Sequence, residues 1–436
     1  MVIGTAVAVM LMVTAAVYLP DIGRGFVKDD FGWIRDARAG LSDPLGALLR
    51  QPGFFRPLVM SSFALDYVLY GVNPRPYGFT NLALYFLCIA AIWGLLREAG
   101  LTRTAASVGA FAWALNPHGI NMAVVWLSGR TSLLLTACAA LSARAFLRRQ
   151  RVAGSLMLLG ALLSKEEATV LPFVLMIWLW ALRDEDRHAL VLDAVAVCVP
   201  LVVYGLLRAQ SPALTPNTAP WFYRPTTDLR LLALNAIEYL DRGATFFVLI
   251  GLAAWAAYRP GRLAIPKPII LAGAAWFVAG YALTLWIPVR SSLYSVFPSV
   301  GSALLCAGAV DAFRSAPSAR RAGDAWLAAA LASMLVFIPV YQSRNDRWVE
   351  PARLSARALR EVSAHPPKAA GVVVFEDEDA QFASFTDAFG SFAAEAASEA
   401  IRRPGDARIE TGPEHSHGPA AARYRLTRGR IERLSP

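Results

Sequence analysis

Long apolar segments with few charged residues alternate with short polar connections along most of this chain. We count about eleven such segments, many of them close to the roughly 20 residues that cross a bilayer as one helix. The pattern therefore predicts an all-α polytopic membrane protein. Its transmembrane helices are expected near residues 2–20, 77–96, 103–120, 131–147, 152–164, 168–182, 189–207, 243–258, 268–287, 293–313 and 325–341.

Arginine and lysine residues concentrate in every second connection between these segments. Positively charged connections stay on the cytoplasmic side, so the alternation predicts a cytoplasmic N-terminus and an extracytoplasmic C-terminus. We expect the membrane to be a bacterial inner (plasma) membrane. The outer side then receives residues 21–76, 116–130, 164–167, 209–242, 289–294 and the chain after 343.

The ends of the chain and its longest outer connections have features of their own. Residues 2–20 lack a basic leader and a clear cleavage site, so we interpret them as an uncleaved helix, with a cleaved signal peptide as the alternative. The long first outer connection contains an amphipathic stretch, Pro57–Tyr70, that should lie along the membrane surface or pack on the bundle. Residues 209–242 begin rich in proline and then predict another amphipathic helix.

The polar chain after the last apolar segment predicts a second domain. Residues 1–342 are expected to form the transmembrane domain, and residues 343–436 a small extracytoplasmic α/β appendage with a disordered end. Within the appendage the pattern predicts helices over 346–362 and 385–402 and strands over 371–375 and 424–434.

Composition agrees with a membrane protein and excludes some functions. Hydrophobic residues make up 56% of the chain, above the usual share in soluble domains. A net charge of +10 would suggest nucleic acid binding in a soluble protein, but the arginines here lie between apolar segments, so we expect no nucleic-acid partner. All four cysteines lie in apolar segments, which predicts free thiols.

Two adjacent carboxylates, Asp29 and Asp30, follow the first predicted helix. Such a pair can supply a general base for an incoming hydroxyl and can hold a divalent cation. The alternative is a solvated turn that caps a helix. A metal, if one is present, is expected at this pair.

Several cationic side chains lie on the same predicted side. Lys165 and Glu166 interrupt two short apolar segments, where charge is costly and often functional; the alternative is an exposed loop. Arg130 and Arg290 lie at outer ends of predicted helices and can bind phosphate, or can act as interfacial anchors beside aromatic residues such as Tyr294. His118 could contact a substrate, although an interfacial histidine is more often inert.

These charged residues all fall on the outer side of the predicted topology. Carboxylates together with cations at one membrane face suit the transfer of a group from a lipid phosphate. The cations would stabilise the departing phosphate, and a carboxylate would accept the proton of the acceptor.

The ordered motifs resemble those of the multi-spanning C-type glycosyltransferases. The resemblance covers roughly residues 1–345 and is strongest to the branch of protein O-mannosyltransferases and tetratricopeptide-containing O-mannosyltransferases, although this chain lacks the repeats. The motifs are DDF at 29–31, FFRPL at 54–58, LDYVLYGVNPRPYGFTNLALYF at 65–86, NPHGINMAVVWLSGR at 116–130, LLSKEEATVLP at 162–172 and RSSLYSVFPSVGSALL at 290–305.

The resemblance implies an enzyme that moves a sugar, of hexosyl or mannosyl type, from a polyprenyl phosphate to an acceptor with inversion at the anomeric centre. It implies Asp29 and Asp30 as catalytic candidates. It also implies donor-phosphate binding by Arg56, Arg130, Lys165 and Arg290, and a pocket shaped by Asn81 and Tyr294. From their own positions we add His118 and Glu166 to that pocket.

Sequence analysis thus predicts a glycosyltransferase of the bacterial cell envelope that acts on the extracytoplasmic face. Its partners would be a lipid-linked sugar donor and a protein or glycan acceptor. Two alternatives use the same residues: a transporter or flippase of lipid-linked sugars, and a non-catalytic scaffold in envelope-polymer assembly. Transporters commonly carry inverted repeats, and we find no such internal symmetry.

Overall fold

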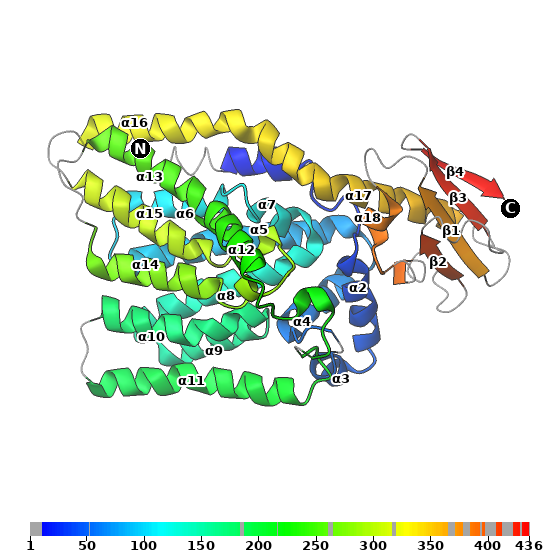
Figure 1. Ribbon diagram of the computed structural model, residues 1–436, viewed down its shortest axis with the longest axis horizontal. Helices are drawn as coiled ribbons and strands as arrows, with labels where there is room; N and C mark the ends of the chain where they lie inside the picture. Colours follow the sequence, from blue (N-terminus) through cyan, green and yellow to red (C-terminus); the bar gives the residue numbers. More distant parts are fainter. Residues whose placement is uncertain are drawn as a thin grey trace.

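A bundle of helices forms most of the molecule, and a small β-sheet lies beyond one end of it (Figure 1). The computed structural model describes residues 11–51, 53–183, 187–215, 217–259, 265–315, 320–364, 371–377, 384–392, 395–396, 407–411, 422–427 and 430–435. The start of the first predicted helix and the polar tail around residues 412–421 lie outside the described residues.

Each predicted transmembrane segment from residue 77 onward contains a helix. The helices within 103–120, 268–287 and 293–313 are shorter than predicted, and η7 (Met334–Phe337) interrupts the segment 325–341. Local signals set the ends: Asn73 caps α5 and is followed by proline, and the Thr102 side chain caps α6. The bundle helices are α5 (Pro74–Glu98), α6 (Arg103–Ala114), α8 (Arg130–Leu147), α9 (Arg151–Leu162), α10 (Leu171–Leu182), α11 (Arg187–Ala209), α13 (Phe246–Tyr258), α14 (Lys267–Gly280), α15 (Ser299–Arg314) and α16 (Arg320–Ser333).

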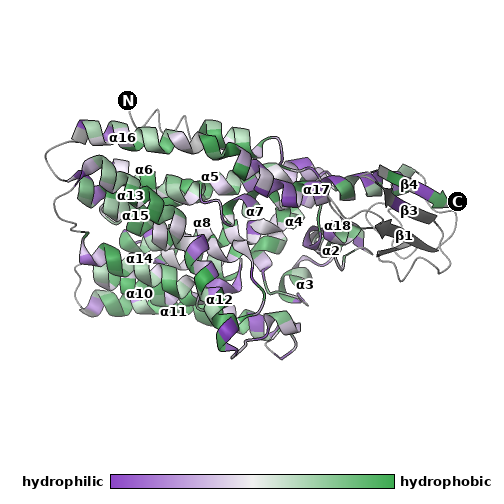
Figure 2. Ribbon diagram, turned by 45° about the horizontal axis from the view of Figure 1, so that its top comes forward, coloured by the Kyte–Doolittle hydropathy of each residue, from purple (hydrophilic) through white to green (hydrophobic). Residues whose placement is uncertain are grey.

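The apolar lengths support a membrane protein and leave the count of eleven spans unconfirmed. Within the described residues, three helices are long and apolar enough to cross a membrane, or four if the bent pair 321–333 and 338–364 is one span. Several others, such as α9 with 12 residues, are shorter than a full crossing. Large apolar side chains lie exposed on the bundle surface, and Figure 2 shows hydrophobic residues along these helices.

The first predicted outer connection folds into three helices at the end of the bundle nearer the sheet (Figure 1). They are α2 (Asp29–Gly40), α3 (Pro44–Leu49) and α4 (Pro57–Tyr70). A helix over 57–70 is confirmed, but its apolar residues lie on all sides and not on one face. α4 buries Phe63 and Asp66 but exposes Leu65 and Val68. The second amphipathic helix is α12 (Leu229–Leu240), which continues through a π-helical turn into α13.

Short helical elements connect the longer helices. α7 (Ile120–Val125) and the 3₁₀ turn η1 (Leu127–Gly129) precede α8. The remaining short elements are η2 (Glu166–Val170), η3 (Trp221–Tyr223), η4 (Asp241–Thr245), η5 (Thr284–Trp286), η6 (Ser292–Ser295) and η7 (Met334–Phe337).

One long helix joins the bundle to the C-terminal appendage. α17 (Ile338–Ala364) runs across the predicted domain boundary at 343, and the division into two domains stays a prediction. The sheet has the strand order β2-β1-β3-β4, with β1 parallel to β2 and β3 and with β3 antiparallel to β4.

The appendage confirms part of the predicted pattern and corrects part of it. β1 (Gly371–Asp377) confirms the strand expected over 371–375. The single strand predicted over 424–434 is wrong, because the structure has two antiparallel strands there, β3 (Ala422–Thr427) and β4 (Arg430–Ser435). The sequence pattern gave no indication of β2 (Ala407–Thr411). Of the helix predicted over 385–402, the structure has α18 (Phe385–Phe389), and much of the rest lies outside the described residues.

Two hydrophobic cores divide the molecule. The larger core lies among the bundle helices. The smaller one gathers Phe31 of α2, Phe63 of α4, Val362 of α17, Phe389 of α18 and Tyr424 of β3. The appendage therefore packs against the first outer connection by hydrophobic contact, close to the Asp29–Asp30 pair.

The predicted orientation can be tested by labelling introduced cysteines. We expect a cysteine replacing Thr227 to react with a membrane-impermeant maleimide in intact cells, because it lies in an outer connection. A cysteine replacing Gln150 should react only after permeabilisation. The reverse labelling pattern would show that the orientation in the membrane is opposite to the predicted one.

Candidate functional site at the outer end of the bundle

Asp29 begins α2 and is solvent-exposed. It follows Lys28, whose backbone has a φ of 50° and a ψ of −117°, a combination that is strained for any residue other than glycine. Protein on the other sides of the carboxylate raises the pKa of Asp29 by desolvation, while Arg56 and Lys28 act in the opposite direction. Asp29 is therefore an accessible carboxylate beside the cation Arg56.

Two ion pairs lie next to this carboxylate. Arg56, at the start of α4, contacts Glu166 at 2.8 Å, and Lys165 contacts Glu167 at 2.8 Å. The break between α9 and α10 positions all three residues of the 165–167 segment. Burial lowers the pKa of Lys165, partly offset by Glu167, and Arg56 holds the pKa of Glu166 below its usual value despite burial. The pairs keep buried cations charged where lipid and protein would otherwise disfavour them.

Aromatic rings lie beside the cations of these two ion pairs. The Lys165 ammonium lies 5.0 Å from the centroid of the Tyr294 ring, and the Arg56 guanidinium lies 4.1 Å from that of Phe54. Tyr223 of η3 packs edge-to-face on Phe54 with centroids 5.2 Å apart. The structure thus brings together five predicted site residues: Asp29, Arg56, Lys165, Glu166 and Tyr294.

Asp30 has a different environment from its neighbour. Its side chain is buried, and both oxygens accept hydrogen bonds. One accepts from the Val27 N–H at 2.9 Å, and the other accepts from the N–H of Ser128 at 2.8 Å and from its hydroxyl. Burial raises the pKa of Asp30 to about 7, with the Ser128 hydrogen bond acting against the rise. Asp30 therefore ties the start of α2 to the turn before α8.

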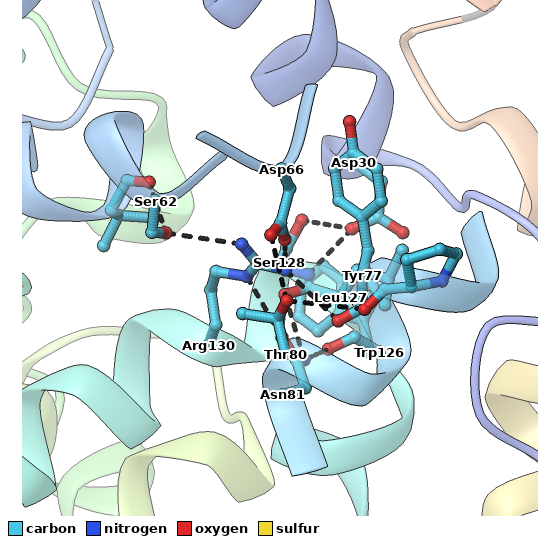
Figure 3. A network of polar contacts seen from close by, with 12 residues as sticks. Asp30, Ser62, Asp66, Tyr77, Thr80, Asn81, Trp126, Leu127, Ser128 and Arg130 are labelled. Atoms are coloured by element: carbon cyan, nitrogen blue, oxygen red, sulfur yellow. Dashed lines mark hydrogen bonds and ion pairs between the residues drawn. The ribbon is translucent and has the colours of Figure 1, made fainter. Parts of the chain in front are cut away.

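Arg130 lies in the interior of a buried polar network (Figure 3). Its guanidinium pairs with Asp66 at 2.7 Å and donates to the Asn81 side-chain oxygen at 3.0 Å. The amide of Asn81 in turn faces the carbonyls of Trp126 and Leu127, each at 3.2 Å. Thr80 donates to Asp66 at 2.9 Å.

Arg290 and His118 lie outside this cluster. Arg290 pairs with Glu238 of α12, which also binds Arg242. His118 contacts Arg344 of α17, with its Nδ1 3.3 Å from the guanidinium. The phosphate-binding and pocket roles of these residues stay predictions.

The donor set around Asp29 and Asp30 does not fit a shared metal ion. Both Asp30 oxygens already accept hydrogen bonds from the protein. Among the described residues, no three His, Cys, Asp or Glu side chains gather closely enough to hold a metal. No step proposed below passes through a metal.

Sequence reasoning missed several residues of this region. Asp66 carried a usable signal, because a carboxylate inside an otherwise apolar helix needs a partner. Ser128 and Tyr223 carried none, since a serine in a turn and an aromatic residue in a proline-rich connection are common. Their roles depend on contacts with segments roughly 100 residues or more away along the chain.

Solved structures provide the comparison for this chain. ArnT from Cupriavidus metallidurans bound to undecaprenyl phosphate matches with a TM-score of 0.55 and 16% identity, over 94% of this chain and 86% of that one. The Archaeoglobus fulgidus oligosaccharyltransferase tethered to an acceptor peptide matches with a TM-score of 0.53 and 11% identity, over 95% of this chain and 64% of that one. No family model and no curated protein matches.

This chain therefore has the fold of both neighbours, which are multi-spanning C-type glycosyltransferases, and the resemblance predicted from its motifs is confirmed at the level of the fold. The O-mannosyltransferase branch stays a prediction.

The position of Arg130 predicts a stability effect. Replacing Arg130 with Met leaves Asp66 buried and unpaired, which should cost about 3–5 kcal/mol of unfolding free energy. Thermal unfolding in detergent measures this. Arg50→Met, which breaks the exposed pair with Asp43, is the matched control and should change stability little, and Asp66→Leu/Arg130→Met is expected to recover part of the loss. An Arg130→Met protein that is as stable as wild type but binds polyprenyl phosphate weakly would instead support the phosphate-binding role.

Proposed function

We propose that this protein is a membrane glycosyltransferase that moves a sugar from a polyprenyl-phosphate donor to a hydroxyl-bearing acceptor at the extracytoplasmic face. The observation that carries the proposal is the accessible Asp29 carboxylate beside Arg56, which in turn lies near Lys165. A base and cations at one membrane face suit a phosphate leaving group. The fold shared with ArnT, which was solved with undecaprenyl phosphate bound, supports a lipid-linked donor.

The roles of the two carboxylates follow from their environments. Asp29 can remove the proton of an acceptor hydroxyl because it is accessible and its pKa is raised toward the working pH. Asp30 has no free oxygen for a substrate, so it positions α2 through Ser128. We assign Asp29 as the base and Asp30 as a positioning residue.

The transfer is a single displacement. The acceptor oxygen attacks the anomeric carbon as Asp29 takes its proton, and the bond from that carbon to the phosphate oxygen breaks. The phosphate leaves with the electron pair, so the anomeric configuration inverts. Arg56 and Lys165 stabilise the developing phosphate charge. Since both are paired with glutamates before the donor binds, the phosphate must compete with Glu166 and Glu167 for them.

Replacing Asp29 tests this assignment. Purified protein in detergent would be given radiolabelled polyprenyl-phosphate sugars, and transfer or release of sugar would be measured. We expect Asp29→Asn to lose roughly 10²–10⁴-fold in turnover because it removes a general base. Asp36→Asn, on the same helix and facing Arg35, is the matched control and should retain activity.

Two results would contradict the proposal. If Asp29→Asn keeps the turnover of the wild type, Asp29 is not the general base. A wild type that binds the lipid but turns over no donor in the panel would favour the transporter or the scaffold.

The environment of Asp29 also predicts a pH dependence. The base is active only when deprotonated, so turnover should fall as the pH drops through its pKa. Because burial raises that pKa, the midpoint of the acid limb should lie above the usual aspartate value of about 3.9. Pre-steady-state turnover measured against pH gives the midpoint. A midpoint at or below that value would mean that another group titrates.

A further inference from the structure

The C-terminal segment 384–392 packs directly on the start of α2, although more than 350 residues separate the two in the sequence. The Lys28 N–H donates to the carbonyl oxygen of Ala388 at 2.9 Å. The Phe31 and Phe389 rings lie 5.9 Å apart, and both side chains are buried. We define this stretch, residues 384–392, as the docking segment.

The contacts concentrate on the residue before the proposed base. Lys28 has the strained backbone already described, and a non-glycine residue keeps such a conformation only where its surroundings hold it. The docking segment supplies a hydrogen bond to its N–H and an ion pair from Asp387 to its ammonium at 3.8 Å. α17 adds Trp348, whose ring centroid lies 5.9 Å from the same ammonium.

The docking segment is shaped for this contact. Ser384 and Asp387 form a capping box that starts α18. Gly390 ends it with a φ of 55°, and a Cβ there would lie 3.4 Å from Lys28 Cγ. On α2, a Cβ at Gly32 would lie 2.9 Å from the Phe392 ring, so this ring packs closely against the α2 backbone at Gly32.

We propose that the docking segment is a positioning element for Asp29, with Phe389 as its central positioning residue. This inference rests on the proposed function. The segment holds Lys28 in its strained conformation and thereby fixes the direction in which the first turn of α2 presents the Asp29 carboxylate. Loss of docking would let Lys28 relax and move the base relative to the donor, while the cations on α4 and in the 165–167 segment keep their places.

The proposal predicts a specific kinetic defect. A misplaced base slows the chemical step but leaves donor binding intact, and small displacements can cost about 10–100-fold. We expect Phe389→Ala to lower kcat by about that factor with the donor KM nearly unchanged. Phe389→Leu, which keeps an apolar side chain in the contact, should restore most of the rate.

A matched control lies just beyond the docking segment. Glu395 pairs with Arg35 at 2.6 Å, farther along α2 from the base. Glu395→Gln weakens an appendage contact without touching Lys28, so it should leave kcat unchanged. Limited proteolysis of the C-terminal residues reports whether the docking segment is bound in each variant. Thermal unfolding reports whether the bundle is folded.

A second measurement reports the accessibility of Asp29 and does not require enzymatic turnover. A carbodiimide modifies carboxyl groups according to their accessibility, and mass spectrometry gives the rate at Asp29. Phe389→Ala should raise this rate several-fold, and Glu395→Gln should not. A Phe389→Ala protein that is verified as undocked, with both kcat and the Asp29 labelling rate at wild-type values, would overturn the proposal. Changed labelling in a protein without turnover would support positioning but contradict the transferase.

Discussion

The buried ion pair between Asp66 and Arg130 is the interaction on which the end of the bundle with the proposed site depends. It joins α4 to the start of α8 in the bundle. The Arg130 side chain is fully buried, so the arrangement is stable only while Asp66 and Asn81 satisfy the guanidinium. The same network faces the turn that carries Ser128, and Ser128 holds Asp30. A chain of polar contacts thus runs from the membrane bundle to the helix that bears the proposed base.

This connection explains why two adjacent aspartates take different roles. Helix geometry directs consecutive side chains apart, so Asp30 points into the protein while Asp29 remains accessible. One carboxylate anchors the helix, and the other is free for chemistry. Hydrophobic packing of Phe31 and Phe389 holds the same helix from the opposite direction, so the start of α2 is fixed both by the bundle and by the appendage.

The sequence was informative where physical signals are local. Apolar segment lengths predicted the bundle helices, and the proline and amphipathic pattern predicted α4 with its observed bounds. The motif residues Asp29, Arg56, Lys165, Glu166 and Tyr294 do converge. The network around Arg130 could not be predicted, because a basic residue after glycine at a helix end looks alike whether it faces lipid phosphate or a buried carboxylate. Nor could the contact between residues 28 and 388, because neither segment shows which distant surface will cover it.

The most direct test of the account compares the two aspartates in one assay at saturating donor. Single-turnover transfer would be measured for wild type, Asp29→Asn and Asp30→Asn, each verified as folded by thermal unfolding. The account predicts that Asp29→Asn binds donor normally and loses transfer, while Asp30→Asn loses stability first and keeps measurable transfer in its folded fraction. Transfer that is abolished in folded Asp30→Asn but persists in Asp29→Asn would contradict it.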